Sequence, residues 1–554
     1  MNILEIPELR RVACVPDQLT NHQVDALKRS RENYSQQILI LDERKEELIK
    51  KLSEIDQERS RLLDCVKACQ QALSPMNHVP DDILREIFLQ IYLCFPQYCE
   101  DDSFSLLRPP IVISHVCRRW RTVANDFAVL WTKLRTNRGT QHWDQRGLEL
   151  LAQWLQRAKG TPLNLQLVLG DDRAIQYSSD LQDFKFIAQL IEPIGGSLTR
   201  LFLKYVTVEG CSRLSLLPLP SLEQLVIILD DSAEYPETFS ASFDNTPALR
   251  RISFSGSFEE SLDRKVLLPW NQLTHFLNYS CPDYFEFFLL TNLFLCTQLR
   301  FLFLGIIDCG GVRGYLETSR SSVPKRIVIP SLETLALDFS TIWFREYANT
   351  NPYPNIFFPF EFPNLRKLVL LFNHIAGNVT SPFLDELRRL KNLEHFSIAI
   401  QEDDALIPLQ AMLQALPHIK TLELSLSGEY TPAIAQLTAL PGQQGLLPNL
   451  HTLALMFDAN GLDHDKAFLD PDTLVRFVES RTQRALATRL EKFTIVVCSL
   501  DGPDYATLDG VRKVLRPYIP KVLVWSVQCW IILYQRWIHV DPELEGRPEL
   551  LELV

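Results

Sequence analysis

The chain has 554 residues, of which 46% are hydrophobic and 22% charged, and its formal net charge is −12. This length exceeds what one core normally organises, so we expect two to four structural units. The negative charge argues against a general binder of nucleic acid or of an acidic membrane surface, because such proteins need an excess of Lys and Arg. No secretory signal is visible, and the longest apolar run (522–534) is too short to span a bilayer. The 12 cysteines include no C-x-x-C pair, so we expect a reduced protein of the cytoplasm and/or nucleus.

Residues 22–73, which follow an N-terminal segment (1–21), contain neither Pro nor Gly. Two columns at heptad spacing predict one long, charged helix. The first column is Leu27, Tyr34, Leu41, Leu48, Ile55, Leu62 and Cys69, and the second is Val24, Arg31, Ile38, Lys45, Leu52, Arg59, Val66 and Leu73. A self-paired coiled coil would make the protein a homodimer. The alternative is a helix that folds back on its own chain or stands partly in solvent.

Residues 74–135 predict a pair of short amphipathic helices. The first follows Pro80 and has an apolar stripe at Ile83, Leu84, Ile87, Phe88, Ile91, Tyr92 and Phe95. In the second, Ser114 is the predicted N-cap, and the apolar face is Val116, Cys117, Trp120, Val123 and Phe127, followed by Leu130 and Trp131. Such helices bury too little surface to be stable alone. We therefore expect them to dock on a partner protein or on the next domain.

Residues 136–500 contain a repeated pattern, L-x-x-L-x-L, in which Ile or Phe replaces some leucines. It begins at Leu198, Leu222, Leu249, Leu299, Leu332, Leu365, Leu393, Ile419, Leu450 and Leu490, with a weaker copy at Leu273. Period two within each copy predicts a short strand with alternate residues buried. Stacked copies predict an α/β repeat, a leucine-rich-repeat-like solenoid of parallel strands. Strands of a Leu-rich sandwich would show the same spacing.

One position separates these two folds. Three residues after the last apolar position, a leucine-rich repeat places a side chain that bonds to the backbone of the turn. Polar residues or Cys occupy this position in eight of ten copies, which favours the solenoid: Asp230, Ser257, Ser340, Asn373, Gln401, Ser427, Asp458 and Cys498, against Val206 and Ile307.

Residues 501–554 interrupt the pattern and contain Trp525, Trp530 and Trp537. An exposed solenoid end needs a cover, so we interpret this segment as a C-terminal cap. A cluster of aromatic side chains that stacks on a ligand is the alternative. The chain shows no zinc-protease, nucleophile-elbow, phosphate-loop or dinucleotide motif. We therefore expect no catalytic, cofactor or metal site, and no enzyme.

The segment "VPDDILREIF…VISHVCRRWRTVANDFAVLWTKL" (residues 79–134) resembles the F-box. The whole chain is similar to the F-box-domain proteins of mushroom-forming fungi, which combine a charged N-terminal helix, an F-box and a degenerate leucine-rich repeat. In that family the F-box binds the Skp-type adaptor of a cullin–RING ubiquitin ligase, and the repeats capture a protein substrate. The adaptor-facing residues that the resemblance implies are Pro80, Ile83, Leu84, Ile87, Val116, Trp120 and Trp131.

The resemblance therefore implies a substrate-recognition subunit of a Skp–cullin–F-box E3 ubiquitin ligase. A scaffold or interaction protein that ubiquitinates no substrate is the alternative. In each strand, alternate residues point to the concave face of the solenoid. Substrate-binding candidates on that face are Phe202, Lys204, Ile228, Phe303, Asp338, Leu371, Glu423 and Met456. The face carries few charges, which favours a peptide groove or a cover from the same chain over a phosphopeptide pocket. An idle face remains a third interpretation.

Overall fold

A computed structural model of the chain divides it into two compact units, residues 1–87 and residues 88–554. The residues that it describes are 20–73, 78–94, 103–106, 108–136, 145–169, 190–229, 241–255, 266–281, 292–306, 327–339, 360–372, 381–400, 406–426, 430–438, 446–458, 470–482, 490–498, 513, 515–519 and 521–527. Most of the predicted N-terminal segment and of the predicted cap, including Trp530 and Trp537, therefore lie outside the described residues.

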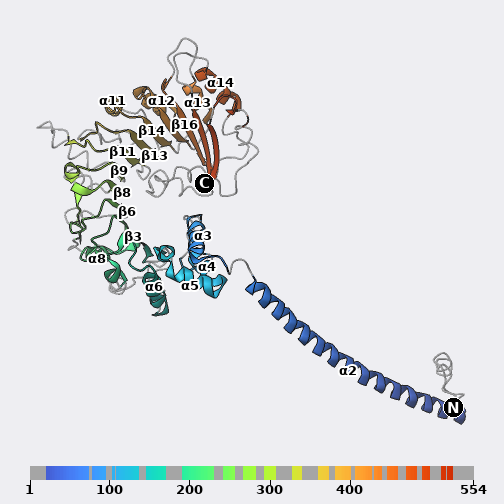
Figure 1. Cartoon of the computed structure of the whole chain (residues 1–554). Helices are drawn as coiled ribbons and strands as arrows, with labels where there is room; N and C mark the ends of the chain where they lie inside the picture. The colour runs from blue at the N-terminus through green and yellow to red at the C-terminus, as the bar shows by residue number, and fades with distance from the viewer. Residues whose placement is uncertain are drawn as a thin grey trace. The chain divides into compact units, whose positions relative to one another are not determined.

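The main element of the first unit is one long helix, α2 (Asn21–Ala72), drawn in blue in Figure 1. It confirms the predicted helix to within one residue at each end. The backbone N–H of Thr20 donates to Oε1 of Gln23 at 3.0 Å, which is half of a capping box at the helix start. Side chains one turn apart form exposed ion pairs, such as Lys51 with Glu47 at 2.5 Å.

The boundary between the two units lies inside helix α3 (Asp81–Cys94), which is the predicted F-box-like first helix. Asp81 and Asp82 occupy its first turn, where the helix dipole favours negative charge. The backbone N–H of Leu84 donates to the carbonyl of Pro80 at 3.0 Å, so the helical bonding begins directly after the proline.

The predicted second helix is in fact two helices, α4 (Pro109–Val116) and α5 (Arg118–Asp126), followed by the 3-10 turn η3 (Ala128–Trp131). The prediction that Ser114 is the cap was wrong. Its hydroxyl lies within α4 and donates to the carbonyl of Ile111. The chain is extended at Cys117, whose sulfur accepts the N–H of Trp120 at 3.4 Å and caps α5. The single extended residue Cys117 therefore separates α4 from α5.

The described part of the second unit contains one sheet of fourteen strands in which every neighbouring pair is parallel. In spatial order its strands are β1 (Lys133–Arg135), β2 (Leu163–Val168), β3 (Leu198–Val206), β4 (Gln224–Leu229), β6 (Arg251–Ser255), β8 (His275–Cys281), β9 (Phe301–Ile306), β11 (Thr334–Phe339), β13 (Lys367–Phe372), β14 (His395–Ile400), β15 (Thr421–Leu426), β16 (Thr452–Asp458), β17 (Lys492–Cys498) and β18 (Lys521–Val527). Two small parallel pairs accompany it: β5 (Ala241–Ser242) with β7 (Val266–Leu267), and β10 (Ile327–Val328) with β12 (Phe360–Glu361).

Each predicted L-x-x-L-x-L copy coincides with one of these strands, and the α/β repeat is confirmed. Fourteen of the described strands form one parallel sheet, which is not the arrangement of a sandwich. The first apolar residue of each copy is almost fully buried, as Leu222, Leu299 and Leu393 illustrate. The sheet also extends beyond both predicted limits. β1 lies inside the segment that we assigned to the F-box, and β18, which contains Trp525, lies inside the predicted cap.

Helices connect many of the strands. They are α6 (Gln145–Arg157), α8 (Val208–Leu214), α11 (Ser381–Arg389), α12 (Leu406–Ala415), α13 (Tyr430–Leu437) and α14 (Pro471–Thr482), with 3-10 turns η5 (Glu192–Ile194), η6 (Trp270–Gln272) and η7 (Leu293–Leu295). Figure 1 shows α11 to α14 in succession along one side of the sheet. Because these helices cover one face, the other face of the sheet is the place to look for binding.

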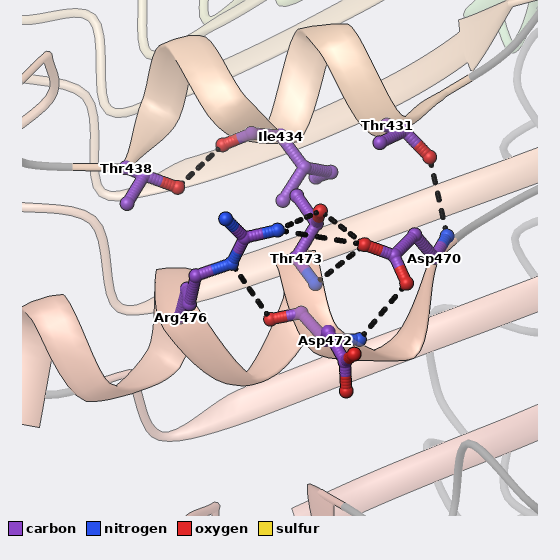
Figure 2. Close-up of polar contacts among 7 residues, drawn as sticks. All are labelled: Thr431, Ile434, Thr438, Asp470, Asp472, Thr473 and Arg476. Atoms are coloured by element: carbon purple, nitrogen blue, oxygen red, sulfur yellow. Dashed lines mark hydrogen bonds and ion pairs between the residues drawn. The ribbon is translucent and has the colours of Figure 1, made fainter.

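The start of α14 is tied to the preceding helix, as Figure 2 shows. Asp470 caps α14 by accepting the N–H groups of Asp472 at 3.2 Å and Thr473 at 3.0 Å. Nη2 of Arg476 lies 3.6 Å from the same carboxylate. The hydroxyl of Thr431 on α13 accepts the N–H of Asp470 at 3.1 Å. The bond from Asp470 to Thr431 joins the start of α14 to α13. The polar side chains of Thr431, Asp470 and Arg476 thus have partners within the chain.

Candidate interaction surfaces

The predicted adaptor-facing residues of α3 in the first unit differ in exposure. Ile83 is 53% exposed, Pro80 is exposed and Ile87 is half-buried, whereas Leu84 is fully buried. Ile83, Ile87 and Ile91 follow each other at one-turn spacing, so they share a face of this helix. Leu84 lies in the core and does not belong to an open surface. Helix α3 therefore has an exposed apolar face at Ile83 that is available for binding.

In the second unit, two exposed apolar residues of the F-box-like segment lie on α4. Val112 and Val116 are 46% and 56% exposed and one turn apart, so they form a second apolar face. Trp120 on α5 is half-buried, because its ring packs against Phe88 with centroids 5.0 Å apart. Part of the Trp120 ring therefore packs inside the fold, and only the remaining, exposed part is available for binding.

Trp131, the last predicted adaptor-facing residue, is fully buried. Its indole N–H donates to the carbonyl of Ala124 at 2.8 Å, and its ring meets that of Trp154 edge-on at 4.8 Å. Trp154 in turn donates to the carbonyl of Trp131 at 2.9 Å, and the Arg157 guanidinium lies 4.5 Å from the Trp131 ring. Burial lowers the pKa of Arg157 below its ordinary value. Trp131 therefore packs between the short helices and α6, and its ring has no exposed surface for a partner.

The predicted substrate-binding residues do lie in register on the sheet. Two rows of Cα partners contain them. One row runs through Phe202, Phe303 and Glu423. The other joins Lys204 to Ile228 and Asp338 to Leu371 and Met456, and it is interrupted between β6 and β9, where the register shifts. The period-two pattern thus identified their common face correctly, because side chains at every second residue of a strand share a face.

The middle of this face is closely packed. Phe303 is fully buried, and Asp338, Leu371 and Met456 are at most 6% exposed. Phe303 and Leu371 belong to a cluster of buried apolar residues: Leu277, Phe301, Phe303, Ala336, Val369, Leu371 and Ala399, with Tyr279 packed against it. Burial raises the pKa of the Tyr279 hydroxyl above its ordinary value. The four buried candidates are therefore unavailable to a substrate as the chain stands, and only Phe202, Lys204, Ile228 and Glu423 are partly exposed.

Glu423 belongs to a polar cluster on strands β13 to β15. Its Oε2 accepts the Ser397 hydroxyl at 2.8 Å and lies 3.1 Å from Nε2 of His395 and 3.8 Å from Nζ of Lys367. Burial raises the pKa of Glu423, but the charges of Lys367 and His395 and the hydrogen bonds outweigh it and hold that pKa well below its ordinary range. Ser397 donates to the carboxylate and not to His395, so the cluster lacks the nucleophile–base contact that covalent catalysis requires.

Sequence reasoning missed a third row on the same face. It lies two residues before the Phe202 row and is rich in basic residues: Arg200, Arg251, His275, Lys367, His395 and Lys492. Period two places these residues on this face, so the sequence contained the signal. The predicted substrate-binding residues come only from the two positions nearest the end of each strand.

Among the described residues, no group of three or more His, Cys, Asp or Glu side chains is placed to hold a metal ion. No helix in the described ranges has the length and apolar content needed to cross a membrane. Comparisons with models of protein families and with curated proteins found no match to this chain.

Proposed function

We propose that this protein is the substrate-recognition subunit of a Skp–cullin–F-box ubiquitin ligase, with a leucine-rich-repeat-like solenoid as its substrate-binding part. The F-box-like sequence of residues 79–134 supports the proposal together with one observation. The apolar residues Ile83 and Val116, at positions that the F-box resemblance assigns to the adaptor, are more than half exposed. Exposed apolar side chains at predicted contact positions are what an interface requires.

In this proposal the α3 face at Ile83 and the α4 face at Val112 and Val116 each bind the Skp-type adaptor. Leu84 and Trp131 contribute by holding the helices in shape, since both are fully buried. Trp120 contributes through the part of its ring that Phe88 leaves open. The proposed role is one of binding, without catalysis by this chain.

The adaptor interface is tested by purifying the full chain with a tagged Skp-type adaptor. We expect Ile83→Asp and Val116→Asp each to weaken adaptor binding by at least about 10-fold, since burying one such side chain contributes roughly 1.5–3 kcal/mol. Leu216→Asp is the matched control, because Leu216 is 80% exposed and lies outside both faces. Equal adaptor recovery from all variants would overturn the proposal.

For the substrate we propose the β3–β4 end of the sheet face, where Phe202, Lys204 and Ile228 remain half-buried. This end combines apolar area with the cations Arg200 and Lys204 of β3, which suits an extended peptide segment. Proximity labelling with the proteasome blocked would identify proteins that depend on this face. We expect labelling of a true substrate to fall when Phe202 and Ile228 are both changed to Ser, while adaptor recovery stays unchanged.

The packed middle of the same face favours a second candidate function. Phe303, Asp338 and Leu371 are unavailable to a ligand, as expected for a scaffold that binds the adaptor without delivering substrates. The two functions differ in one readout. A substrate receptor has partners whose ubiquitination and turnover stop when Val116→Asp replaces the wild type, whereas a scaffold has none.

A further inference from the structure

Helix α2 keeps a long apolar seam in solvent. Seven side chains of its heptad columns between residues 38 and 66 are 51–67% exposed: Ile38, Leu41, Leu48, Leu52, Ile55, Leu62 and Val66. An open groove on the helix surface is lined by Leu41, Arg44, Lys45, Leu48, Ile49 and Leu52. Farther towards the N-terminus, Val24, Leu27 and Tyr34 are half-buried. A continuous row of exposed apolar side chains of this kind marks an interaction surface.

We propose that this seam binds the same seam of a second copy of the chain, with the two helices antiparallel. The pairing joins residues 38–69 of the two copies. With the neighbouring positions on each side of the seam, it involves about 20 residues of each copy, the lower end of the roughly 20–30 found in a standard interface. The proposal concerns α2 alone and does not depend on adaptor binding.

The cations in the seam select the antiparallel direction. Lys45 and Arg59 occupy the same heptad column as Ile38, Leu52 and Val66. In a parallel pair in register, each column faces its own copy, so Lys45 would face Lys45 and Arg59 would face Arg59 inside the interface. In an antiparallel pair each column faces the other column, which contains no charged residue between Leu41 and Cys69. Every cation then lies against an apolar side chain, over which its aliphatic stem packs while its charge reaches water.

The charges beside the seam select the register. With Leu52 opposite Ile55, the other facing pairs are Lys45 with Leu62, Leu48 with Arg59, Leu41 with Val66, and Ile38 with Cys69. On the flank of the seam, Lys51 then faces Glu58 of the second copy, twice by symmetry. This register pairs the exposed part of the helix and leaves the half-buried residues Val24, Leu27 and Tyr34 outside the interface.

Neighbouring registers are less favourable because like charges meet. Moving one copy by one heptad towards the N-terminus places Lys51 opposite Lys51 and Asp42 opposite Asp56. A second heptad of movement places Arg44 opposite Lys51. Like charges that face each other at flanking positions repel, so they disfavour both of these shifted registers.

A single substitution in the full chain tests direction and register together. Cys69 is exposed and reduced, so Ile38→Cys should form a disulfide with Cys69 of a second copy under mild oxidation. Peptide mass spectrometry would identify the 38–69 link in the dimer. Leu39→Cys is the matched control, because Leu39 is 62% exposed but lies outside both columns. We expect at least about 10-fold less link from Leu39→Cys, since a disulfide forms only when the Cα atoms approach within about 7 Å.

Other results would overturn the proposal. A Cys69–Cys69 link in the wild type would show a parallel pair, and equal linking from both variants would show random collision. Sedimentation velocity gives a second readout without cysteines. Changing Leu48 and Leu52 to Glu should raise the dimer dissociation constant by at least about 100-fold, whereas changing Leu39 and Ile40 to Glu should leave it nearly unchanged. A wild-type chain that stays monomeric at every concentration would also overturn it.

Discussion

The parallel sheet and the long helix α2 use similar apolar residues with opposite results. Leu335 on β11 is 1% exposed, whereas Leu52 on α2 is 63% exposed. In the sheet, period-two residues find neighbours on the adjacent strands of the same chain, as Leu335 does with Leu302 and Leu368. On α2 the apolar residues of the heptad columns between residues 38 and 66 are instead 51–67% exposed. In a repeat of strands each strand thus buries its apolar residues against the next, whereas a helix with a heptad pattern buries its apolar columns only against another helix.

The largest expected effect comes from one substitution made in both regions. Leu335→Ala should lower the free energy of unfolding by about 2–5 kcal/mol, because it leaves a cavity in a packed core. Leu52→Ala should change the free energy of unfolding of the second unit by less than about 0.5 kcal/mol, because Leu52 lies on α2 in the first unit and takes no part in the packing of the sheet. Tryptophan fluorescence in a denaturant titration measures the second unit, since all 9 Trp residues follow residue 119. Equal effects of the two variants would contradict the comparison.

A pH effect of intermediate size is expected from His275, in the basic row of the sheet. Burial above all, then the charges of Arg251 and Arg300, lower the pKa of His275 to about 4. Between the ordinary value near 6.5 and this lowered value, the unfolded chain binds a proton that the folded chain does not. Stability should therefore fall as the pH falls through this window, by at most about 1.4 kcal/mol per pH unit.

The matched variant for this effect is His275→Phe. A Phe ring keeps the stacking on Phe301, whose centroid lies 5.7 Å from that of the imidazole, and cannot take up a proton. Urea titrations at several pH values between 6.5 and 4 should give a flatter dependence for the variant than for the wild type. Parallel curves would show that His275 is not the titrating group.

The contrast also explains which parts of the structure could be predicted from the sequence. Local periodicity was sufficient for α2 and for strands such as β11 and β16, because period two and period 3.5 are properties of neighbouring residues. The break at Cys117 was missed, since an extended Cys cap has no strong sequence signal. The burial of Leu84 and Trp131 was missed for a different reason. Trp131 is covered by Trp154 and Arg157, which are 23 and more residues away in sequence.

The candidate substrate face was predicted in register but not in accessibility. The alternation of side chains along one strand assigns Phe303 to the candidate substrate face. Its burial, however, involves Leu277, Ala336 and other residues of neighbouring repeats. Those contacts arise from how the repeats stack, and the spacing of the repeats is irregular. A one-dimensional pattern therefore identifies which side of the sheet a residue occupies, and only the packed structure tells whether it is open.

The smallest expected effect tests whether the sheet also depends on its exposed charges. Arg300 and Glu333, in successive repeats, form a two-bonded ion pair at 2.9 and 3.1 Å, but both side chains are more than 40% exposed. Exposed pairs contribute about 0.2–1 kcal/mol, and salt screens them. Arg300→Ala should therefore lower stability by no more than this amount, and less in 1 M NaCl than in 0.05 M NaCl. The double variant with Glu333→Ala isolates the pair from the loss of the Arg stem. A coupling well above 1 kcal/mol would mean that charge, and not apolar burial, holds adjacent repeats in register.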